Sequence, residues 1–245
     1  MSTRIKIVLS YDGTEFCGWQ RQKNGISVQE TVENAIFGLT GENVTVTASG
    51  RTDAGVHAAG QVAHFDTNAN IPPEKFYKAL NTFLPDSVKA ISSEKVSDKF
   101  NARRNAKRKT YEYSLYVSDT VLPLKERYCA RVYGDIDVDK MRSAARVLEG
   151  EHDFKAFSAS GGNVKTTVRT IFGIMVEKTG EEIKIQVCGN GFLYNMVRIM
   201  AGALVKAGKG ELSENDLIKA LKTGERDLLG ETLPAKGLCL IKVEY

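Results

Sequence analysis

Residues 4–11, RIKIVLSY, indicate the fold class, because Ile5, Ile7 and Leu9 occupy every second position. This alternation is typical of a half-buried β-strand. The next patterned segment, residues 28–39, carries its apolar side chains at helical spacing, as an amphipathic helix does. The chain is therefore predicted to open with a strand followed by a helix.

The same periodicities continue along the chain and predict two similar halves. In the first half, further β-type stretches are expected at residues 44–47, 61–65 and 88–96, and a helix that prolines open is expected at residues 72–84. In the second half, strands are expected at residues 110–117, 128–132 and 238–245, and a hairpin at 168–177 and 182–187. Helices are expected at residues 141–148, 193–207 and 214–222. We expect an α+β protein of two pseudo-repeated β-α-β-β-α-β halves, each RRM-like or ferredoxin-like with a mainly antiparallel sheet. The halves are expected at residues 1–104 and 105–245.

The composition is that of a globular protein, since 42% of the 245 residues are apolar and 26% are charged. The formal net charge of +4 permits a nucleic-acid partner without requiring one. Four scattered cysteines form no CxxC pair, so neither a zinc site nor a disulfide framework is expected. No apolar run reaches the ~18 residues that cross a bilayer, and no signal-peptide pattern is present. We therefore expect a cytoplasmic protein.

The most unusual stretch is residues 48–65, ASGRTDAGVHAAGQVAHF, in which glycines surround Arg51 and Asp53. The glycine spacing imitates a phosphate-binding loop, but Val56 and His57 stand where such a loop needs Lys and Ser or Thr. This excludes nucleotide hydrolysis. Asp53 is then either the cap of a tight turn or a carboxylate that serves as a nucleophile or general base.

Two histidines near this loop, His57 and His64, raise the alternative of a metal site shared with Asp53. Their spacing across a turn and a strand does not fix a ligand geometry, and structural histidines are the more frequent outcome. A metal-dependent phosphoesterase would also need a denser cluster of His, Asp and Glu. We therefore expect no metal.

A second stretch, YDGTEFCGWQRQ at residues 11–22, contains the only tryptophan, Trp19, and then Gln20 and other polar or basic residues. It is either the end of a strand with Trp19 over the core or a contact surface for nucleic acid. The sequence alone does not choose between these two interpretations.

Basic residues make up five of the seven positions from 103 to 109. They are Arg103, Arg104, Lys107, Arg108 and Lys109. A charge run is usually a solvated face, but this one leads directly into Tyr111 and Tyr113. Cations beside strand aromatics suit single-stranded RNA, whose phosphates meet the charges and whose bases stack on the rings. The segment does not match the RNP1 pattern of RRM domains.

The helix expected at residues 193–207 contains an anomalous arginine, Arg198, which points away from the apolar face into small and apolar neighbours. Gly202, one turn further on, is expected to leave space beside the guanidinium. Arg198 is either a snorkelling side chain at a domain boundary or the partner of a carboxylate or phosphate, because an unpaired buried charge is costly.

Four of these blocks together resemble the signature blocks of the tRNA pseudouridine synthase I family, also called the tRNA pseudouridine synthase A family, in that family's order. They are YDGTEFCGWQRQ (11–22), GRTDAGVHAAGQVAHF (50–65), KRKTYEY (107–113) and GFLYNMVRIMAG (191–202). Several blocks in register are far more specific than any one loop.

The resemblance implies an enzyme that isomerises uridine to pseudouridine at positions 38, 39 and 40 of the anticodon stem-loop of tRNA. It also implies no cofactor, a homodimer that binds tRNA across both subunits, and two halves whose sheets join around a central basic cleft. Asp53 matches the family's catalytic aspartate, Tyr111 the tyrosine that stacks on the target base, and Arg198 the arginine that pairs with the aspartate. Arg51, in the same motif as Asp53, is expected to bind the substrate.

This chemistry breaks the N-glycosidic bond, rotates the base and joins C5 of uracil to C1′. Asp53 would attack C1′, add to C6 or abstract a proton from the sugar, and the sequence does not choose among these. Arg198 would keep the Asp53 carboxylate ionised, and Tyr111 would hold a base that has left the helical stack. The remaining alternative is a silent RNA-binding relative, which should have lost Asp53 or Arg198, and both are present.

Overall fold

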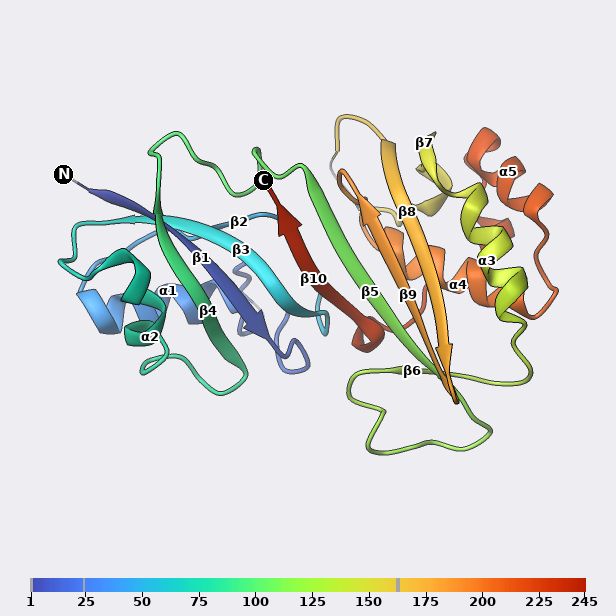
Figure 1. The fold of residues 1–245 in the computed structure, drawn as a ribbon, viewed down its shortest axis with the longest axis horizontal. Coiled ribbons are helices and arrows are strands. Elements are labelled where there is room, and N and C mark those ends of the chain that lie inside the picture. The colour runs from blue at the N-terminus through green and yellow to red at the C-terminus, as the bar shows by residue number, and fades with distance from the viewer. Residues whose placement is uncertain (1, 24, 162–163) are drawn as a thin grey trace. The chain divides into compact units, whose positions relative to one another are not determined.

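The computed structural model describes residues 2–23, 25–161 and 164–245, and it divides the chain into two compact units (Figure 1). The first unit contains the chain up to Lys107 together with Leu240–Tyr245. The second unit contains Arg108–Cys239.

The first unit consists of an antiparallel sheet with helices. Its elements are β1 (Thr3–Tyr11), α1 (Val28–Thr40), β2 (Thr47–Ala48), β3 (His57–Thr67), a 3₁₀ turn (Pro73–Lys75), α2 (Phe76–Leu80) and β4 (Val88–Val96). The strand order is β4-β1-β3, and β2 pairs with β3. Strand β1 pairs antiparallel with both of its neighbours. The final strand, β10 (Leu238–Glu244), continues into this unit and lies beside β3.

The core of the first unit follows the predicted periodicities. The alternating side chains Ile5, Ile7 and Leu9 of β1 are at most 1% exposed. Helix α1 begins at the N-cap Ser27, whose hydroxyl accepts a hydrogen bond from the amide of Glu30, and ends at Gly41 in the left-handed conformation. Both helix ends therefore lie where the capping residues of the sequence place them.

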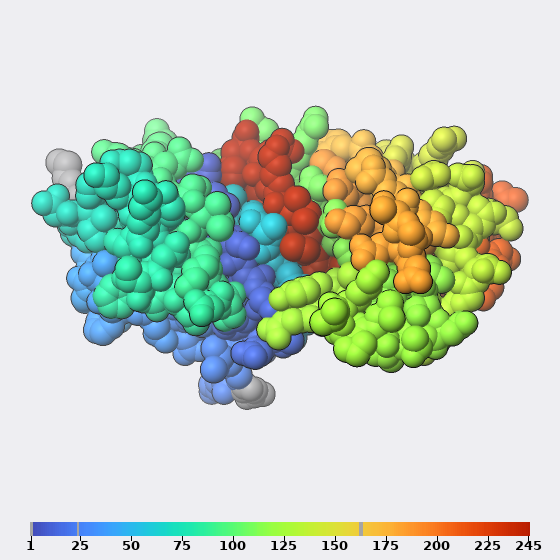
Figure 2. Space-filling model, turned by 60° about the horizontal axis from the view of Figure 1, so that its bottom comes forward, coloured from blue at the N-terminus to red at the C-terminus, as the bar shows by residue number. Residues whose placement is uncertain are grey.

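The second unit combines an antiparallel sheet with a layer of helices. Its elements are β5 (Arg108–Val117), β6 (Ala130–Val132), α3 (Val138–Val147), β7 (Gly150–Asp153), a 3₁₀ turn (Lys155–Phe157), β8 (Val168–Thr179), β9 (Glu182–Gly189), α4 (Met196–Gly208), α5 (Glu214–Thr223) and 3₁₀ turns at Asp227–Leu229 and Ala235–Gly237. The strand order is β5-β9-β8-β7, and β6 pairs parallel to β5. Helix α3 packs against α4 and β8. The loop between β5 and β6 (yellow-green in Figure 2) is at the surface, where Leu124 is 97% exposed.

Several predicted elements differ in extent from the observed ones. The strand expected at 61–65 is the longer β3, His57–Thr67, and three further differences have an identifiable cause. The strand expected at residues 44–47 is reduced to Thr47–Ala48, because the amide of Val46 donates to the Glu33 carboxylate at 2.9 Å instead of to a strand. The helix expected at 72–84 ends at Leu80, since the side chain of Asn81 pairs with the backbone of Ala90 on β4.

The third correction concerns the long helix, which begins at Met196 and not at residue 193. Asn195 has φ 60° and ψ 8°, a left-handed conformation that cannot continue into an α-helix. Strand β7 and the 3₁₀ turns were not predicted. The two units are mixed α+β with mainly antiparallel strands, and the pseudo-repeat of the halves stays a prediction. Across the described residues, every helix is too short or too polar to cross a bilayer.

Candidate active site

Asp53 lies on a tight turn between β2 and β3. The carbonyl of Asp53 accepts a hydrogen bond of 3.1 Å from the amide of Val56, and Gly55 has φ 76°. A positive φ at the third position of a turn is easily adopted only by glycine, so the sequence Asp-Ala-Gly-Val closes this turn without strain. The Asp53 side chain is half-buried.

The residue before Asp53 is anchored on both its backbone and its side chain. The carbonyl of Thr52 accepts a hydrogen bond of 3.0 Å from the amide of Trp19. The hydroxyl of Thr52 is 2.8 Å from the buried hydroxyl of Tyr11 at the end of β1. The backbone amide of Trp19 and the side chain of Tyr11, both far away in the sequence, therefore fix the residue next to Asp53.

Two glycines bring residues 11–22 into direct contact with the turn. A Cβ on Gly13 would overlap the carbonyl oxygen of Val56. A Cβ on Gly18, which has φ 100°, would lie 2.6 Å from the carbonyl oxygen of Thr52. The stretch YDGTEFCGW thus packs backbone against backbone with the loop that carries Asp53. Trp19 is 3% exposed and lies over the core beside Tyr11, whereas Gln20 is exposed.

A buried polar group fixes the beginning of the loop. The side-chain amide of Gln61 on β3 donates to the carbonyl of Gly50 at 2.9 Å, and its oxygen accepts from the hydroxyl of Ser49 at 2.7 Å. Gln61 is fully buried. The loop is therefore held at Gly50 and at Thr52, on both sides of Arg51.

The two histidines of this region occupy separate structural positions. Nδ1 of His57 accepts from the amide of Gly13 at 3.0 Å, and Nδ1 of His64 accepts from the amide of Ala102 at 3.2 Å. Both rings are 6% exposed. Among the described residues, no group of three or more His, Cys, Asp or Glu side chains is arranged to hold a metal ion.

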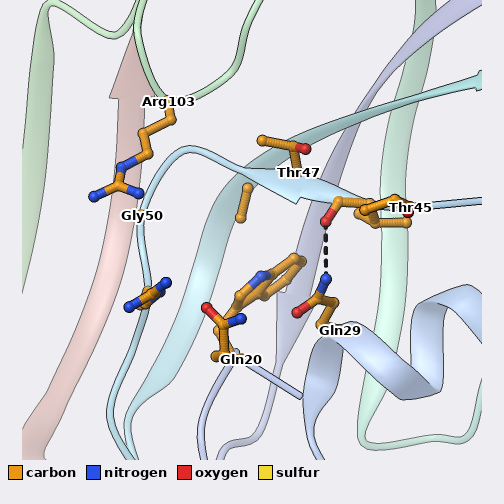
Figure 3. A pocket seen from close by; sticks show the side chains of 10 residues that line it. Gln20, Gln29, Thr45, Thr47, Gly50 and Arg103 are labelled. Carbon is orange, nitrogen blue, oxygen red and sulfur yellow. Dashed lines mark hydrogen bonds between the residues drawn. The ribbon is translucent and has the colours of Figure 1, made fainter.

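A pocket of about 170 Å³ opens beside the loop of Asp53 (Figure 3). Its lining residues all belong to the first unit and are Trp19, Gln20, Gln29, Thr45, Val46, Thr47, Ala48, Gly50, Arg51 and Arg103. In Figure 3, Arg103 lies above the pocket, and Gln20 and Gln29 lie below it. The structure thus brings together Arg51 and Arg103, two predicted RNA-contacting residues from distant parts of the sequence.

The basic segment spans both units, and its side chains are exposed except for the half-buried Lys109. Arg103, Arg104 and Lys107 belong to the first unit, and Arg108 and Lys109 begin β5 in the second. The backbone amides of Arg103 and Arg104 donate to the side chain of Asn101 at 3.1 and 3.0 Å. The Arg108 guanidinium lies 4.8 Å from the ring centroid of Phe172, a cation–π arrangement.

Tyr111 lies on β5 of the second unit, opposite Val187 of β9. Its side chain is 8% exposed, and its ring is nearly perpendicular to that of Phe192, with centroids 5.2 Å apart. The next tyrosine on the same face, Tyr113, is fully buried and donates its hydroxyl to the carbonyl of Pro234 at 2.6 Å. Burial raises the pKa of Tyr113 far above its ordinary value. The strand therefore has Tyr111 at the edge of the core and Tyr113 inside it.

Arg198 lies in the first turn of α4 and is held by two acceptors of the second unit. Its Nε donates to the carbonyl of Leu233 and its Nη1 to the side-chain oxygen of Asn195, both at 2.7 Å. Its Nη2 donates to no side chain or carbonyl among the described residues. The guanidinium is thus oriented with one nitrogen available to an anion.

The prediction that Gly202 leaves space beside the Arg198 guanidinium is wrong. A Cβ on Gly202 would overlap the carbonyl oxygen of Glu231, so the loop of residues 230–233 fills this position. Gly202 serves the close approach of that loop, and the loop in turn supplies the carbonyl of Leu233 to Arg198. Sequence reasoning missed Asn195 and Leu233. Only Asn195 carries a signal, a polar residue three positions before Arg198 at the start of a helix.

Sequence comparisons match nearly the whole chain to one protein family. The sequence profile described as tRNA pseudouridine synthase matches residues 7–103 and 144–245. The chain is 44% identical to the tRNA pseudouridine synthase A of Thermoanaerobacter sp. (strain X514) over 241 residues, which cover 98% of this chain and 99% of that protein. It is 45% identical over 243 residues to the protein of the same name from Ruminiclostridium cellulolyticum (strain ATCC 35319 / DSM 5812 / JCM 6584 / H10), covering 99% of each chain.

Similarity to solved structures is much weaker. Alignment with a chain in the crystal structure of a Cbf5-Nop10-Gar1 complex gives 13% identity and a TM-score of 0.41, and it covers 96% of this chain and 48% of that one. The family therefore rests on sequence similarity, which extends over nearly the whole chain. On this similarity the chain belongs to the tRNA pseudouridine synthase family, whose members are isomerases acting on tRNA.

Proposed function

We propose that this chain isomerises uridine to pseudouridine at positions 38, 39 and 40 in the anticodon stem-loop of tRNA, with Asp53 as the catalytic carboxylate. The observation that carries the proposal is the fixed turn at Asp53, anchored at Thr52 by Tyr11 and Trp19. A charged group can stabilise a reacting centre only if it is held in place before the reaction. Membership of the synthase family supports the same reaction.

The reaction conserves all atoms of the nucleoside except for one exchanged proton. The bond between N1 and C1′ breaks, the uracil turns, a bond forms between C5 and C1′, the proton on C5 leaves to water, and N1 takes up a proton from water. The Asp53 carboxylate acts next to C1′ by attacking that carbon, adding to C6 or removing a proton from the sugar. Each of these routes needs an ionised carboxylate, and none needs a cofactor or a metal.

Arg198 and Tyr111 are assigned to the same site by the resemblance of their motifs. Arg198 keeps Asp53 ionised, because a cation beside a carboxylate lowers its pKa. The contacts with Asn195 and Leu233 orient the guanidinium and leave Nη2 available for this pairing. Tyr111 stacks on the flipped uracil, and Arg51 binds the RNA next to it.

Affinity for tRNA comes from phosphates, which supply most of the binding free energy of nucleic-acid complexes. The basic segment provides cations for this purpose, four of them exposed (Arg103, Arg104, Lys107 and Arg108) and one half-buried (Lys109). We further propose a cytoplasmic homodimer that contacts tRNA with both subunits, with the aspartate loop in residues 1–104 and the tyrosine and arginine in residues 105–245.

A tRNA transcript labelled with tritium at C5 of uridine tests the reaction. Incubation with the protein in excess chelator should release tritium to water, and primer-extension mapping should place pseudouridine at positions 38, 39 and 40. A transcript with cytidine at these three positions should release none. Tight binding without release would identify a silent RNA-binding relative, and release from the cytidine transcript would contradict the assigned positions.

A further inference from the structure

We propose that the pocket between Arg51 and Arg103 binds a single phosphodiester of the RNA strand that carries the target uridine. This inference rests on the proposed function, because it takes RNA as the substrate. It assigns a defined subsite to Arg103, which would otherwise be one of five basic residues between positions 103 and 109.

The pocket holds two cations that have no partner within the described chain. The guanidinium groups of Arg51 and Arg103 make no hydrogen bond or ion pair with the described residues, and both side chains are exposed. A buried carboxylate of the first unit, Glu33, already accepts from two lining residues, the amide of Val46 at 2.9 Å and the side chain of Gln29 at 3.0 Å. Arg21 neutralises its charge at 2.5 Å. The pocket is therefore electropositive.

Both arginines extend from a fixed backbone. Arg51 stands between Gly50, which is held by Gln61, and Thr52, which is held by Trp19. Arg103 follows Ala102, whose amide donates to the buried His64 at 3.2 Å, and its own amide donates to the side chain of Asn101. Less conformational freedom is lost when an anion binds to such anchored groups.

The other walls favour a phosphate over a nucleobase. Gln20, Thr45 and Thr47 present polar side chains to the pocket, but its only aromatic ring, Trp19, is 3% exposed and offers no face for stacking. A guanidinium binds phosphate oxygens through two parallel hydrogen bonds, and two of them can hold one phosphate from two sides. The site thus recognises backbone charge and not base identity.

The position of the pocket defines which phosphate it takes. Arg51 precedes Asp53 by two residues, so their Cα atoms are at most ~7 Å apart. A phosphate bound at Arg51 therefore belongs to a nucleotide next to the target uridine or one step further along. This contact would fix the register of the strand while the uridine leaves the stack.

The test measures binding of an anticodon stem-loop RNA to the full-length protein. Arg103→Ala should raise the Kd about tenfold and reduce the slope of log Kd against log salt by about 0.7–0.9, the effect of one lost phosphate contact. Lys99→Ala is the matched comparison, since Lys99 is an exposed basic residue of the first unit that neither lines the pocket nor belongs to the basic segment. It should raise the Kd by no more than about twofold to threefold, as a long-range charge does.

A series of RNAs that each carry one uncharged methylphosphonate identifies the phosphate. One position, within two nucleotides of the target, should weaken binding to the wild type and to Lys99→Ala about tenfold, yet have little further effect on Arg103→Ala, because residues in contact are non-additive. Equal losses in Arg103→Ala and Lys99→Ala, or small losses at every phosphate, would overturn the subsite. This experiment measures only binding, so failure of the phosphate subsite can be distinguished from failure of the proposed isomerisation.

Discussion

The side-chain oxygen of Asn195 accepts a hydrogen bond of 2.7 Å from Nη1 of Arg198, although Asn195 is the N-cap residue of α4. An asparagine at this position ordinarily caps the first amides of the helix. Here its left-handed backbone directs the side chain to Arg198, and no side-chain cap is made. The start of α4 is therefore built to orient the arginine.

Two substitutions of Asn195 distinguish the contribution of its side-chain amide from that of its left-handed backbone conformation. Asn195→Gly and Asn195→Ala both remove the acceptor, and we expect both to lower kcat about tenfold, since a hydrogen bond to a charged group contributes ~1.5–3 kcal/mol. Tritium release at saturating tRNA measures this. Wild-type kcat in Asn195→Gly, with a loss only in Asn195→Ala, would show that Asn195 serves the backbone alone.

Gly18 is expected to be essential for the position of Asp53. Gly18→Ala places a Cβ 2.6 Å from the carbonyl oxygen of Thr52 at φ 100°, so the Asp53 loop must shift and the protein should lose more than ~2 kcal/mol of unfolding free energy and most of its kcat. Denaturant unfolding and tritium release provide the two readouts.

The matched control is Gly41→Ala, a second glycine with positive φ, 72°, that has no atom within 4 Å of the added Cβ. It should show only the ~1 kcal/mol strain of the left-handed conformation and keep wild-type kcat. Equal effects of the two substitutions would contradict the packing of Gly18 against the Asp53 loop.

Tyr111 allows stacking to be distinguished from proton transfer. Tyr111→Phe keeps the ring and should retain most activity, whereas Tyr111→Ala removes the ring and should lose it, because base–aromatic stacking contributes ~1–3 kcal/mol. The comparison is made on kcat and KM for tritium release. Loss of activity in Tyr111→Phe as well would assign a role to the hydroxyl, such as removal of the C5 proton.

The stability of the first unit should depend on pH through His64. Burial lowers the pKa of His64, with the Arg4 charge acting in the same direction. As pH falls below ~6.5, the unfolded chain binds a proton that the folded state does not, so stability falls by up to ~1.4 kcal/mol per pH unit from this residue. Between pH 7.5 and 5.5, the unfolding free energy of His64→Gln should therefore fall less steeply than that of the wild type. Identical pH slopes for both proteins in denaturant unfolding would contradict it.

The sequence predicts most elements of this fold because their signals are local. Strand β4 is observed at the predicted residues, and helix α1 extends only one residue beyond its predicted end. Two of the errors come from side chains that hydrogen-bond to backbone groups distant in the sequence, as Glu33 does with the amide of Val46. No periodicity in the sequence reports such a contact.

The candidate site was predictable to a similar degree. The glycine-rich motif identifies Asp53 and Arg51, and motif resemblance assigns Tyr111 and Arg198. The contact of Gly18 with Thr52 joins segments 34 positions apart and depends on the folded backbone. The carbonyl of Leu233 that binds Arg198 has no side-chain signature at all.

The most direct test of the account is tritium release by Asp53→Asn, a substitution that keeps the size of the side chain and removes its charge. The account predicts no detectable release from C5-labelled tRNA and a tRNA Kd close to that of the wild type, because affinity comes from phosphates bound elsewhere. Combining it with Arg198→Ala should add almost nothing, since residues that act as a unit are non-additive. Release of tritium by Asp53→Asn at the wild-type rate would contradict the assignment of Asp53 as the catalytic residue.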